Sequence, residues 1–265
     1  MMTNIAQRAG QLLSLEGKVA VISGAASGIG RGISMRLSEL GAAIVLFDID
    51  QQKGAEAASE IIRQGGEAFF IVGDVRSSHD CNRAIAETIQ KYGKIDILCN
   101  NAGVAIRKTV ESLSEEEWDL ALNVTLKSVF LLSREVVPHM MRFGGGSIIN
   151  TASGWGLKGG PQAAAYCAAK GGVVNLTRAM AIDHGKHNIR VNCVCPGDVD
   201  TPMLRSECAQ LGQKSDLFMK EAAARPIARV GTPEDVANAV LFLVSGMAEW
   251  VTGTCLVVDG GGLAG

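Results

Sequence analysis

The stretch VAVISGAASGIG, residues 19–30, decides how the fold of this chain is interpreted. Its first residues are mostly apolar, as in a strand that is buried on both faces of a parallel sheet. Gly24, Gly28 and Gly30 follow with the spacing G-x-x-x-G-x-G, and a helix-like segment begins directly after them. Glycines permit a tight turn between two such elements. The stretch therefore predicts a strand–turn–helix unit, the first step of an alternating α/β fold.

The same alternation continues along the chain, because apolar runs recur and a helix-like stretch separates each from the next. A helix between successive strands implies crossover connections, so the sheet is predicted to be parallel and covered by helices on both faces. This is a Rossmann-type, doubly wound α/β fold. We expect seven strands, over residues 19–24, 43–48, 68–74, 95–103, 147–153, 189–197 and 254–261. The 265 residues fit one such domain over 15–265, after an N-terminal extension over 1–14.

Composition and charge argue against several classes of function. With a net charge of -2 and a pI of about 6.1, the chain offers no basic surface for nucleic acid or an anionic membrane. The first residues do not resemble a secretory signal, and the apolar run at 239–244 is far too short to span a bilayer. We therefore expect a soluble, cytoplasmic protein.

The cysteines and histidines do not suggest a metal site or a disulfide framework. The chain has seven cysteines, and none forms a C-x-x-C pair. Cys193 and Cys195 fall two residues apart on an expected strand, so they share a face and are assigned to core packing. His184 and His187 stand near an expected helix end, where a cation interacts favourably with the helix dipole. No metal is predicted.

Glycine and acidic residues mark the carboxyl ends of the expected strands, where ligands bind in such sheets. The glycine turn can bring a pyrophosphate to a helix N-terminus, although an ordinary turn would use the same residues. A P-loop is excluded, because no Gly-Lys-Ser/Thr follows. Asp48 ends the second strand, where its carboxylate can accept hydrogen bonds from ribose hydroxyls and would repel a 2′-phosphate. Since Ser27 and Ile49 add no cation, NAD is predicted over NADP, with a plain strand-end turn as the alternative role of Asp48.

Ser153, Tyr166 and Lys170 form a second group of candidate residues. Ser153 ends the fifth expected strand, and Tyr166 and Lys170 are four residues apart in an expected helix over 163–180. Residues i and i+4 share a helix face, so the phenol and the ammonium project together. Each residue alone has an ordinary structural explanation. Together with the glycine turn upstream, they indicate a site that transfers a proton.

With the Asn100–Gly103 segment added, the chain resembles the short-chain dehydrogenase/reductase family, in the branch with a GxxxGxG turn and a YxxxK pair. The resemblance covers residues 15–262. It implies that Asn123, Ser153, Tyr166 and Lys170 are catalytic, and that the protein is a homotetramer, with dimers also common. The residues it implies for binding the cofactor are Ser23, Gly24, Ser27, Gly28, Ile29, Gly30, Asp48, Asp74, Val75, Asn101, Ala102, Gly103, Tyr166, Lys170, Pro196, Gly197, Val199 and Thr201.

These roles suit the oxidation of a secondary alcohol. A free tyrosine has a pKa of about 10, so at pH 7 it is a poor base. A lysine cation one helical turn away and an oxidised nicotinamide both favour the phenolate. Ser153 can hold the substrate oxygen near the hydroxyl of Tyr166. By the resemblance, Asn123 holds a water that links Lys170 to solvent.

The substrate is less clearly indicated than the reaction. Residues 202–231 interrupt the alternation, and we expect two short helices that form a mobile lid. Trp155 has two equal alternatives, contact with the substrate and packing of its loop. An NAD-type acceptor favours a catabolic enzyme, so a polyol, sugar or other small secondary alcohol is ranked first. Reduction of a 3-oxoacyl carrier-protein or CoA thioester, or of another carbonyl, is the alternative, and a non-catalytic NAD-binding protein is the third hypothesis.

Overall fold

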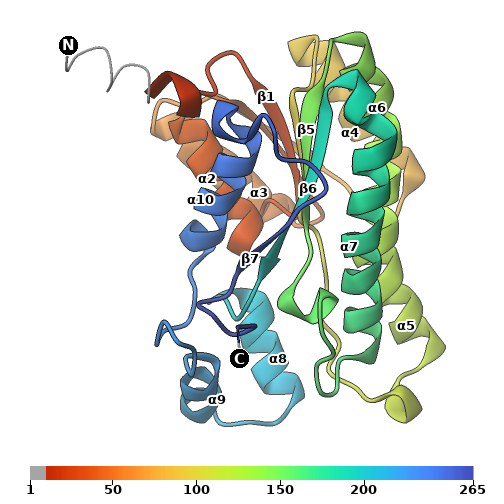
Figure 1. Ribbon diagram of the computed structural model, residues 1–265, viewed down its shortest axis with the longest axis vertical. Helices are drawn as coiled ribbons and strands as arrows, with labels where there is room; N and C mark the ends of the chain where they lie inside the picture. Colours follow the sequence, from red (N-terminus) through yellow and green to blue (C-terminus); the bar gives the residue numbers. More distant parts are fainter. Residues whose placement is uncertain (1–9, 265) are drawn as a thin grey trace.

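A parallel sheet forms the centre of the computed structural model, which describes residues 10–264 (Figure 1). Its strand order is β3-β2-β1-β4-β5-β6-β7, and every neighbouring pair is parallel. The seven-stranded, doubly wound sheet predicted from the sequence is thereby confirmed. The order reverses between β1 and β4, which is the place where such sheets open a crevice for ligands. The strands are β1 (Val19–Ser23), β2 (Ala43–Asp48), β3 (Ala68–Val72), β4 (Ile97–Asn100), β5 (Gly146–Thr151), β6 (Ile189–Pro196) and β7 (Cys255–Val258).

Helices cover both faces of the sheet, as Figure 1 shows. Strand β1 is apolar throughout because both of its faces are buried. Ala20 and Ile22 pack into the core on one face of the sheet, and Val19 and Val21 pack into the core on the other. The first face is covered by α2 (Gly28–Glu39), α3 (Gln51–Arg63) and α10 (Pro233–Val244). The second is covered by α4 (Ser78–Tyr92), α6 (Ser128–Arg142) and α7 (Ala164–His184).

Several strands are shorter than expected, such as β3, which ends at Val72, and β7, which ends at Val258. Two further differences bear on the cavity. The strand expected over 95–103 ends at Asn100, because the next two backbone amides turn toward β1 and donate to the hydroxyl of Ser23. The helix-like stretch expected between the fourth and fifth strands contains two helices, α5 (Glu115–Leu122) and α6, joined by a π-helical segment, Asn123–Lys127. Such widened turns are frequent at functional sites. Here the segment brings the hydroxyl of Thr125 to the backbone amide of Val104, at 3.3 Å.

Two short helices, α8 (Pro202–Gln210) and α9 (Ser215–Ala222), lie beyond the carboxyl ends of the strands (Figure 1). They enclose a small apolar cluster of their own, made by Leu204, Cys208 and Phe218. A bridge between Val199 and Gly231 ties the beginning and end of this 202–231 segment together.

The expected N-terminal extension lies partly outside the described residues, which begin at Gly10. Within residues 10–14 the chain forms a helical turn, and Leu13 packs against the core. Over residues 10–264, the helices are all too short or too polar to cross a membrane.

Candidate active site

A cavity of about 520 Å³ follows the carboxyl ends of the strands. Its lining brings together residues that the sequence places more than a hundred positions apart. Three predicted residues do not line the cavity: Ser23, whose hydroxyl accepts from the amides of Asn101 and Ala102, Gly30, packed under the glycine turn, and Asn123, at the start of the π-helical segment. The predicted residues that line the cavity are Gly24, Ser27, Gly28, Ile29, Asp48, Asp74, Val75, Asn101, Ala102, Gly103, Ser153, Tyr166, Lys170, Pro196, Gly197, Val199 and Thr201.

The backbone of the glycine turn is packed so closely that Gly24 and Gly30 have no room for a side chain. Gly24 has a φ of +64°, and a Cβ there would lie 2.8 Å from the Cα of Ala102. At Gly30, a Cβ would lie 2.0 Å from the carbonyl oxygen of Gly24. Within the described residues, Ser27 makes no side-chain cap to α2 and the first turn of α2 carries no acidic residue. The amides at this helix N-terminus are therefore available to an anion such as a pyrophosphate.

Asp48 has the structural role that was the alternative for it, and it also faces the cavity. One carboxylate oxygen accepts a hydrogen bond of 2.8 Å from the amide of Ala26 in the glycine turn, and the other accepts one of 3.0 Å from the amide of Asp50. The side chain thus fixes the end of β2 to the turn. It also lines the cavity, where its negative charge meets any group bound beside the turn.

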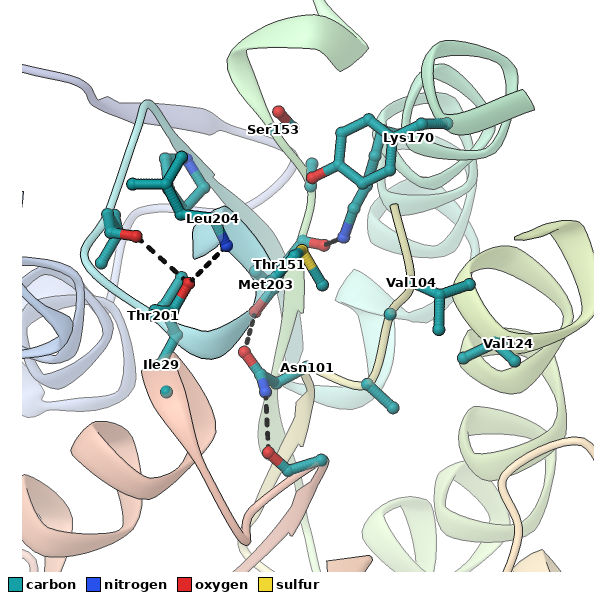
Figure 2. Close-up of a pocket in the computed structure, with 18 of the residues that line it drawn as sticks. Ile29, Asn101, Val104, Val124, Thr151, Ser153, Lys170, Thr201, Met203 and Leu204 are labelled. Atoms are coloured by element: carbon teal, nitrogen blue, oxygen red, sulfur yellow. Dashed lines mark hydrogen bonds between the residues drawn. The ribbon is translucent and has the colours of Figure 1, made fainter. Parts of the chain in front are cut away.

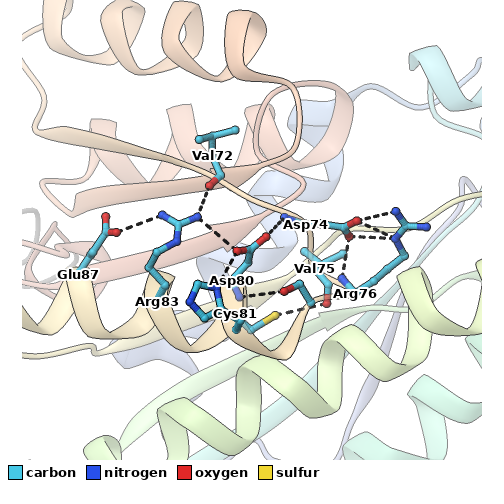
Figure 3. A network of polar contacts seen from close by, with 10 residues as sticks. Val72, Asp74, Val75, Arg76, Asp80, Cys81, Arg83 and Glu87 are labelled. Carbon is cyan, nitrogen blue, oxygen red and sulfur yellow. Dashed lines mark hydrogen bonds and ion pairs between the residues drawn. The ribbon is translucent and has the colours of Figure 1, made fainter.

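A cation that the sequence reasoning missed stands at the same end of the cavity. Arg76 lines the cavity, and its guanidinium donates to both carboxylate oxygens of Asp74, with contacts of 2.6–3.1 Å (Figure 3). This hydrogen bonding holds the pKa of Asp74 below its ordinary value. Asp80 supports the arrangement by accepting from the backbone amide of Asp74 at 3.0 Å. The signal in the sequence was an arginine two residues after a strand-end aspartate.

A continuous chain of hydrogen bonds links the glycine turn to Lys170, as Figure 2 shows. The side-chain amide of Asn101 donates to the carbonyl of Gly24 at 3.1 Å, and its oxygen accepts from the hydroxyl of Thr151 at 3.2 Å. The backbone carbonyl of Thr151 then accepts from the ammonium of Lys170 at 2.5 Å. The two candidate groups of the sequence are therefore parts of one arrangement.

Ser153, Tyr166 and Lys170 meet at the opposite end of the cavity from Asp48. The ammonium of Lys170 lies 5.6 Å from the centre of the Tyr166 ring, as the i, i+4 spacing predicted. The Ser153 hydroxyl oxygen accepts from the amide of Trp155 at 3.1 Å, which leaves its O–H free to donate to a substrate oxygen. Trp155 lines the cavity and also packs on Tyr166 edge to face, with ring centres 6.1 Å apart. Trp155 therefore packs against the neighbouring helix α7 and also forms part of the cavity wall.

Burial sets the protonation of the two titratable groups. It raises the pKa of Tyr166 above its ordinary value, although the neighbouring Ser153 opposes the rise. It lowers the pKa of Lys170 from 10.5 to about 8. Without other charges nearby, the phenol is therefore a proton donor at neutral pH, and a further positive charge is needed before it acts as a base.

A group of three cysteines lies behind Ser153. Cys193 and Cys195 are buried in an apolar cluster, as core packing predicted. Cys255 joins them because it is the register partner of Cys193 on β7, and the three sulfur atoms lie within 4.8 Å of one another. The guanidinium of Arg178 contacts the sulfur of Cys255 at 3.7 Å. The third cysteine was not visible as a partner from sequence, since β7 lies some sixty residues downstream of β6.

Comparison with known proteins identifies this arrangement. A family model described as enoyl-(acyl carrier protein) reductase, one of the short-chain dehydrogenase/reductase models, matches residues 24–262. The chain belongs to the short-chain dehydrogenase/reductase family. As a member of that family, it is an oxidoreductase that acts on hydroxyl or carbonyl groups.

Relatives of this short-chain dehydrogenase/reductase act on different alcohols and ketones. It is 39% identical over 244 residues to a cyclopentanol dehydrogenase of Comamonas sp., covering 92% of this chain and 96% of the relative. It is 37% identical over 250 residues to a 3-oxoacyl-(acyl-carrier-protein) reductase of Thermotoga maritima, covering 94% and 99%. Its structure superposes, with a TM-score of 0.88 and 35% identity, on a 7α-hydroxysteroid dehydrogenase in complex with NADH and 7-oxo glycochenodeoxycholic acid, covering 95% and 96%.

Proposed function

We propose that this enzyme transfers a hydride between NAD and a small secondary alcohol or the corresponding ketone. The observation that carries the proposal is the hydrogen-bonded path from the glycine turn through Asn101 and Thr151 to Lys170. The path supports the proposal because it joins the glycine turn to Lys170 along one cavity. Such an arrangement is required when a cofactor and a substrate must react with each other.

The residues present fit a dinucleotide. The turn has no Cβ atoms at Gly24 and Gly28, so a pyrophosphate can approach the backbone, and the N-terminus of α2 faces it. Asp48 would accept from the adenosine ribose, and the segment from Pro196 to Thr201 would contact the nicotinamide end. When bound, the nicotinamide supplies the acceptor or donor of the hydride.

The protein side of the reaction is a proton transfer at the phenol oxygen of Tyr166. In alcohol oxidation, Ser153 donates to the substrate oxygen and Tyr166 takes the hydroxyl proton, while the hydride leaves the carbon and a ketone forms. Lys170 favours the phenolate by its positive charge. In ketone reduction the neutral phenol, which burial favours, returns the proton to the oxygen. Asn123 would hold a water that passes the proton from Lys170 to solvent.

NAD is favoured over NADP by the charges at the turn. Asp48 is held by the amides of Ala26 and Asp50, so it cannot easily move away from a 2′-phosphate. Arg76 is the cation that could compensate, but its Nε and Nη2 already donate to the carboxylate of Asp74, which offsets its charge. A 2′-phosphate would therefore face a fixed carboxylate and a cation that is already ion-paired.

The wall of the cavity around Tyr166 favours a substrate with an apolar carbon skeleton. The cavity wall includes the apolar side chains of Val104, Val124, Trp155, Met203 and Leu263, and also the charged side chains of Asp198 and Glu207, which lie close enough to Tyr166 to act on its pKa. Hydroxyls of a polyol or sugar that faced the apolar side chains would lack partners, which carries a desolvation penalty. We therefore place an alkyl or cyclic secondary alcohol first, ahead of a polyol or sugar. The cyclopentanol dehydrogenase relative supports this order, and the carrier-protein reductase relative supports a 3-oxoacyl thioester as the second candidate.

The test is a panel of substrates followed by NADH absorbance. Cyclopentanol, cyclohexanol, linear 2-alkanols, a polyol and a 3-oxoacyl thioester are each assayed with NAD(H) and NADP(H). We expect the highest kcat/KM for a cyclic or linear secondary alcohol with NAD. Turnover of the thioester alone would transfer the proposal to the second candidate, and equal efficiency with NADP would contradict the cofactor assignment.

We also propose that the enzyme is a homotetramer. Strand β7 is an edge strand of the sheet, and Val257 on it is exposed, as are Met247 and Trp250 just before it. An apolar edge of this kind needs a cover in solution. Light scattering on the purified protein tests the assembly, and a monomeric mass would overturn it.

A further inference from the structure

Arg107 is an arginine with an unusual environment, in the segment that follows β4 along the cavity. Its side chain is only 8% exposed, although arginine is rarely buried. The guanidinium donates to the carboxylate of Glu207 on α8 at 2.7 Å. It also donates to two backbone carbonyls in the loop before α7, those of Pro161 at 3.1 Å and Gln162 at 3.3 Å. One side chain thus joins three separate segments that surround the substrate end of the cavity.

The backbone beside Arg107 is joined to α8 as well. The amide of Arg107 donates to the side-chain oxygen of Gln210 at 2.9 Å, and the side-chain nitrogen of Gln210 donates to the carbonyl of Ala105 at 3.1 Å. This reciprocal pair fixes the register of α8 against the segment after β4. The contact therefore does not depend on a single flexible side chain.

Arg107 also reaches the catalytic tyrosine through Trp155. Its guanidinium carbon lies 4.8 Å from the centre of the Trp155 ring, a cation–π distance. The same ring also contacts Tyr166, which it meets edge to face. A side chain that holds Trp155 in place therefore also supports one side of Tyr166.

The charges show that Arg107 and Glu207 require each other. Burial raises the pKa of Glu207, and the hydrogen bond from Arg107 opposes the rise. A buried charge whose partner is removed is strongly destabilising. Gln162, whose carbonyl Arg107 binds, has a φ of +50°, which a residue with a side chain rarely adopts. Such a conformation persists only where its surroundings hold it, and the bond to Arg107 is one such constraint.

We propose that Arg107 is a positioning and specificity-determining residue, which clamps α8 and the loop before Tyr166 around the substrate. We call Arg107, Glu207, Trp155 and the carbonyls of Pro161 and Gln162 the Arg107 clamp. It sets the width of the cavity at the end where the apolar wall lies. This inference rests on the proposed function for its kinetic consequences and on the contacts alone for its structural ones.

The experiment compares Arg107→Met and Arg107→Lys with a matched control, Arg205→Met. Arg205 lies on the same helix α8 and also forms an ion pair, but its side chain is 71% exposed and its partner is Asp200. Each variant is measured for NADH affinity, for kcat and KM with the best alcohol of the panel, and for hydrogen exchange in residues 157–163 and 202–211. Glu207→Gln repeats the measurements from the other side of the pair and serves if Arg107→Met does not fold.

We expect Arg107→Met to raise KM for the alcohol by roughly tenfold to a hundredfold, with kcat changed by less than about threefold. Exchange in both segments should accelerate by on the order of tenfold, and NADH affinity should stay unchanged. Arg107→Lys, which keeps the charge but lacks the fork, should lie between wild type and Arg107→Met. Arg205→Met should match wild type.

Three outcomes would overturn the clamp. They are an Arg107→Met variant that behaves like Arg205→Met, a loss of NADH affinity equal to the loss of alcohol affinity, and a fall in kcat without faster exchange. Failure of the proposed function is distinguishable from these outcomes. If wild type oxidises no alcohol, the function fails, while the exchange measurements, which need no substrate, still decide whether Arg107 joins the two segments.

Discussion

The two ends of the cavity are built by different means. The cofactor end, at the glycine turn and Asp48, is made of backbone: amides, positive φ angles and close approaches between main chains. The substrate end, around Trp155, is made of long side chains that meet across the sequence, with Arg107 and Glu207 as the central pair. A bound dinucleotide has one shape, so a rigid backbone suits it, whereas a substrate wall built of side chains can change without altering the fold.

This difference predicts how each end responds to mutation. A change at the cofactor end disturbs packing, because atoms there are already in contact. A change at the substrate end alters which molecule fits, and leaves the sheet intact. Between the two ends, Tyr166 and Lys170 belong to neither scheme, since the role that we propose for them is chemical. The four predictions below test these statements, from the largest expected effect to the smallest.

The largest effect is expected for Tyr166→Phe, which removes only the reacting oxygen. Without the group that exchanges the proton, kcat should fall by about a thousandfold. Affinity for NADH, measured by fluorescence titration, should remain within about twofold of wild type, because the ring and its contact with Trp155 are kept. Near-normal turnover by this variant would refute the mechanism outright.

The buried charge of Lys170 should destabilise the fold at neutral pH, so Lys170→Met should raise the free energy of unfolding. The pKa of Lys170 is about 8 in the folded protein, compared with 10.5 as its ordinary value, so the unfolded chain binds the proton more tightly. Its unfavourable contribution is therefore fully present below pH 8 and disappears as the pH rises toward 10.5, and amounts to about 3 kcal/mol. The lost bond to the carbonyl of Thr151 subtracts about 1 kcal/mol from the gain.

The measurement is chemical unfolding of ligand-free wild type and Lys170→Met between pH 7 and pH 10.5. The variant should be inactive and more stable at pH 7, and the difference should shrink as the pH rises. Using the difference between the two proteins removes the effect of other groups that titrate in the same range, such as Tyr92 and the buried thiols. A difference that stays constant with pH would mean that Lys170 is not the group responsible.

Gly30→Ala tests the backbone packing of the cofactor end. A Cβ at this position would lie 2.0 Å from the carbonyl oxygen of Gly24, and 2.5 Å from the side-chain nitrogen of Asn101. Either the turn or Asn101 must move, at a cost of about 2 kcal/mol in the free energy of unfolding. Affinity for NAD should fall with it. Gly185→Ala is the control, since a Cβ there meets nothing within 4 Å, and a similar loss in that variant would remove the steric explanation.

The sheet could be predicted from sequence because each buried strand is a local apolar run, and helices separate the runs. The glycine turn was visible for a related reason: its backbone geometry requires glycine, so the requirement is written in residue type. Tyr166 and Lys170 were visible because one helical turn fixes their relation. In these cases the information lies within a few residues.

The features that could not be predicted depend on partners far along the chain or on backbone details without a residue signature. Arg107 and Glu207 are separated by 100 positions, and no local sequence pattern around either residue indicates that they form an ion pair. The π-helical segment from Asn123 leaves the apolar pattern of α5 and α6 almost unchanged, so it has no signature in the sequence. Arg76 could not be recognised from sequence, because the position of its guanidinium in the cavity depends on its ion pair with Asp74.

The smallest effect is expected for Asp48→Asn, which tests the contribution of a single charge at the cofactor end of the cavity. Asparagine keeps the size of the side chain and one oxygen that can accept from the amide of Ala26, but it loses the acceptor for the amide of Asp50, so one of the two bonds that hold the end of β2 remains. Removing the negative charge weakens the repulsion of a 2′-phosphate, and kcat/KM with NADP should rise by about tenfold, which is about 1.4 kcal/mol. With NAD, kcat/KM should fall by a similar factor, because a ribose hydroxyl loses its charged acceptor.

The double variant Asp48→Asn with Arg76→Gln separates the effects of the two charges at this end. If Arg76 contacts the 2′-phosphate once residue 48 is neutral, the gain with NADP disappears in the double variant. An unchanged preference in Asp48→Asn would show that the fixed carboxylate does not select the cofactor, and that the backbone of the turn alone does.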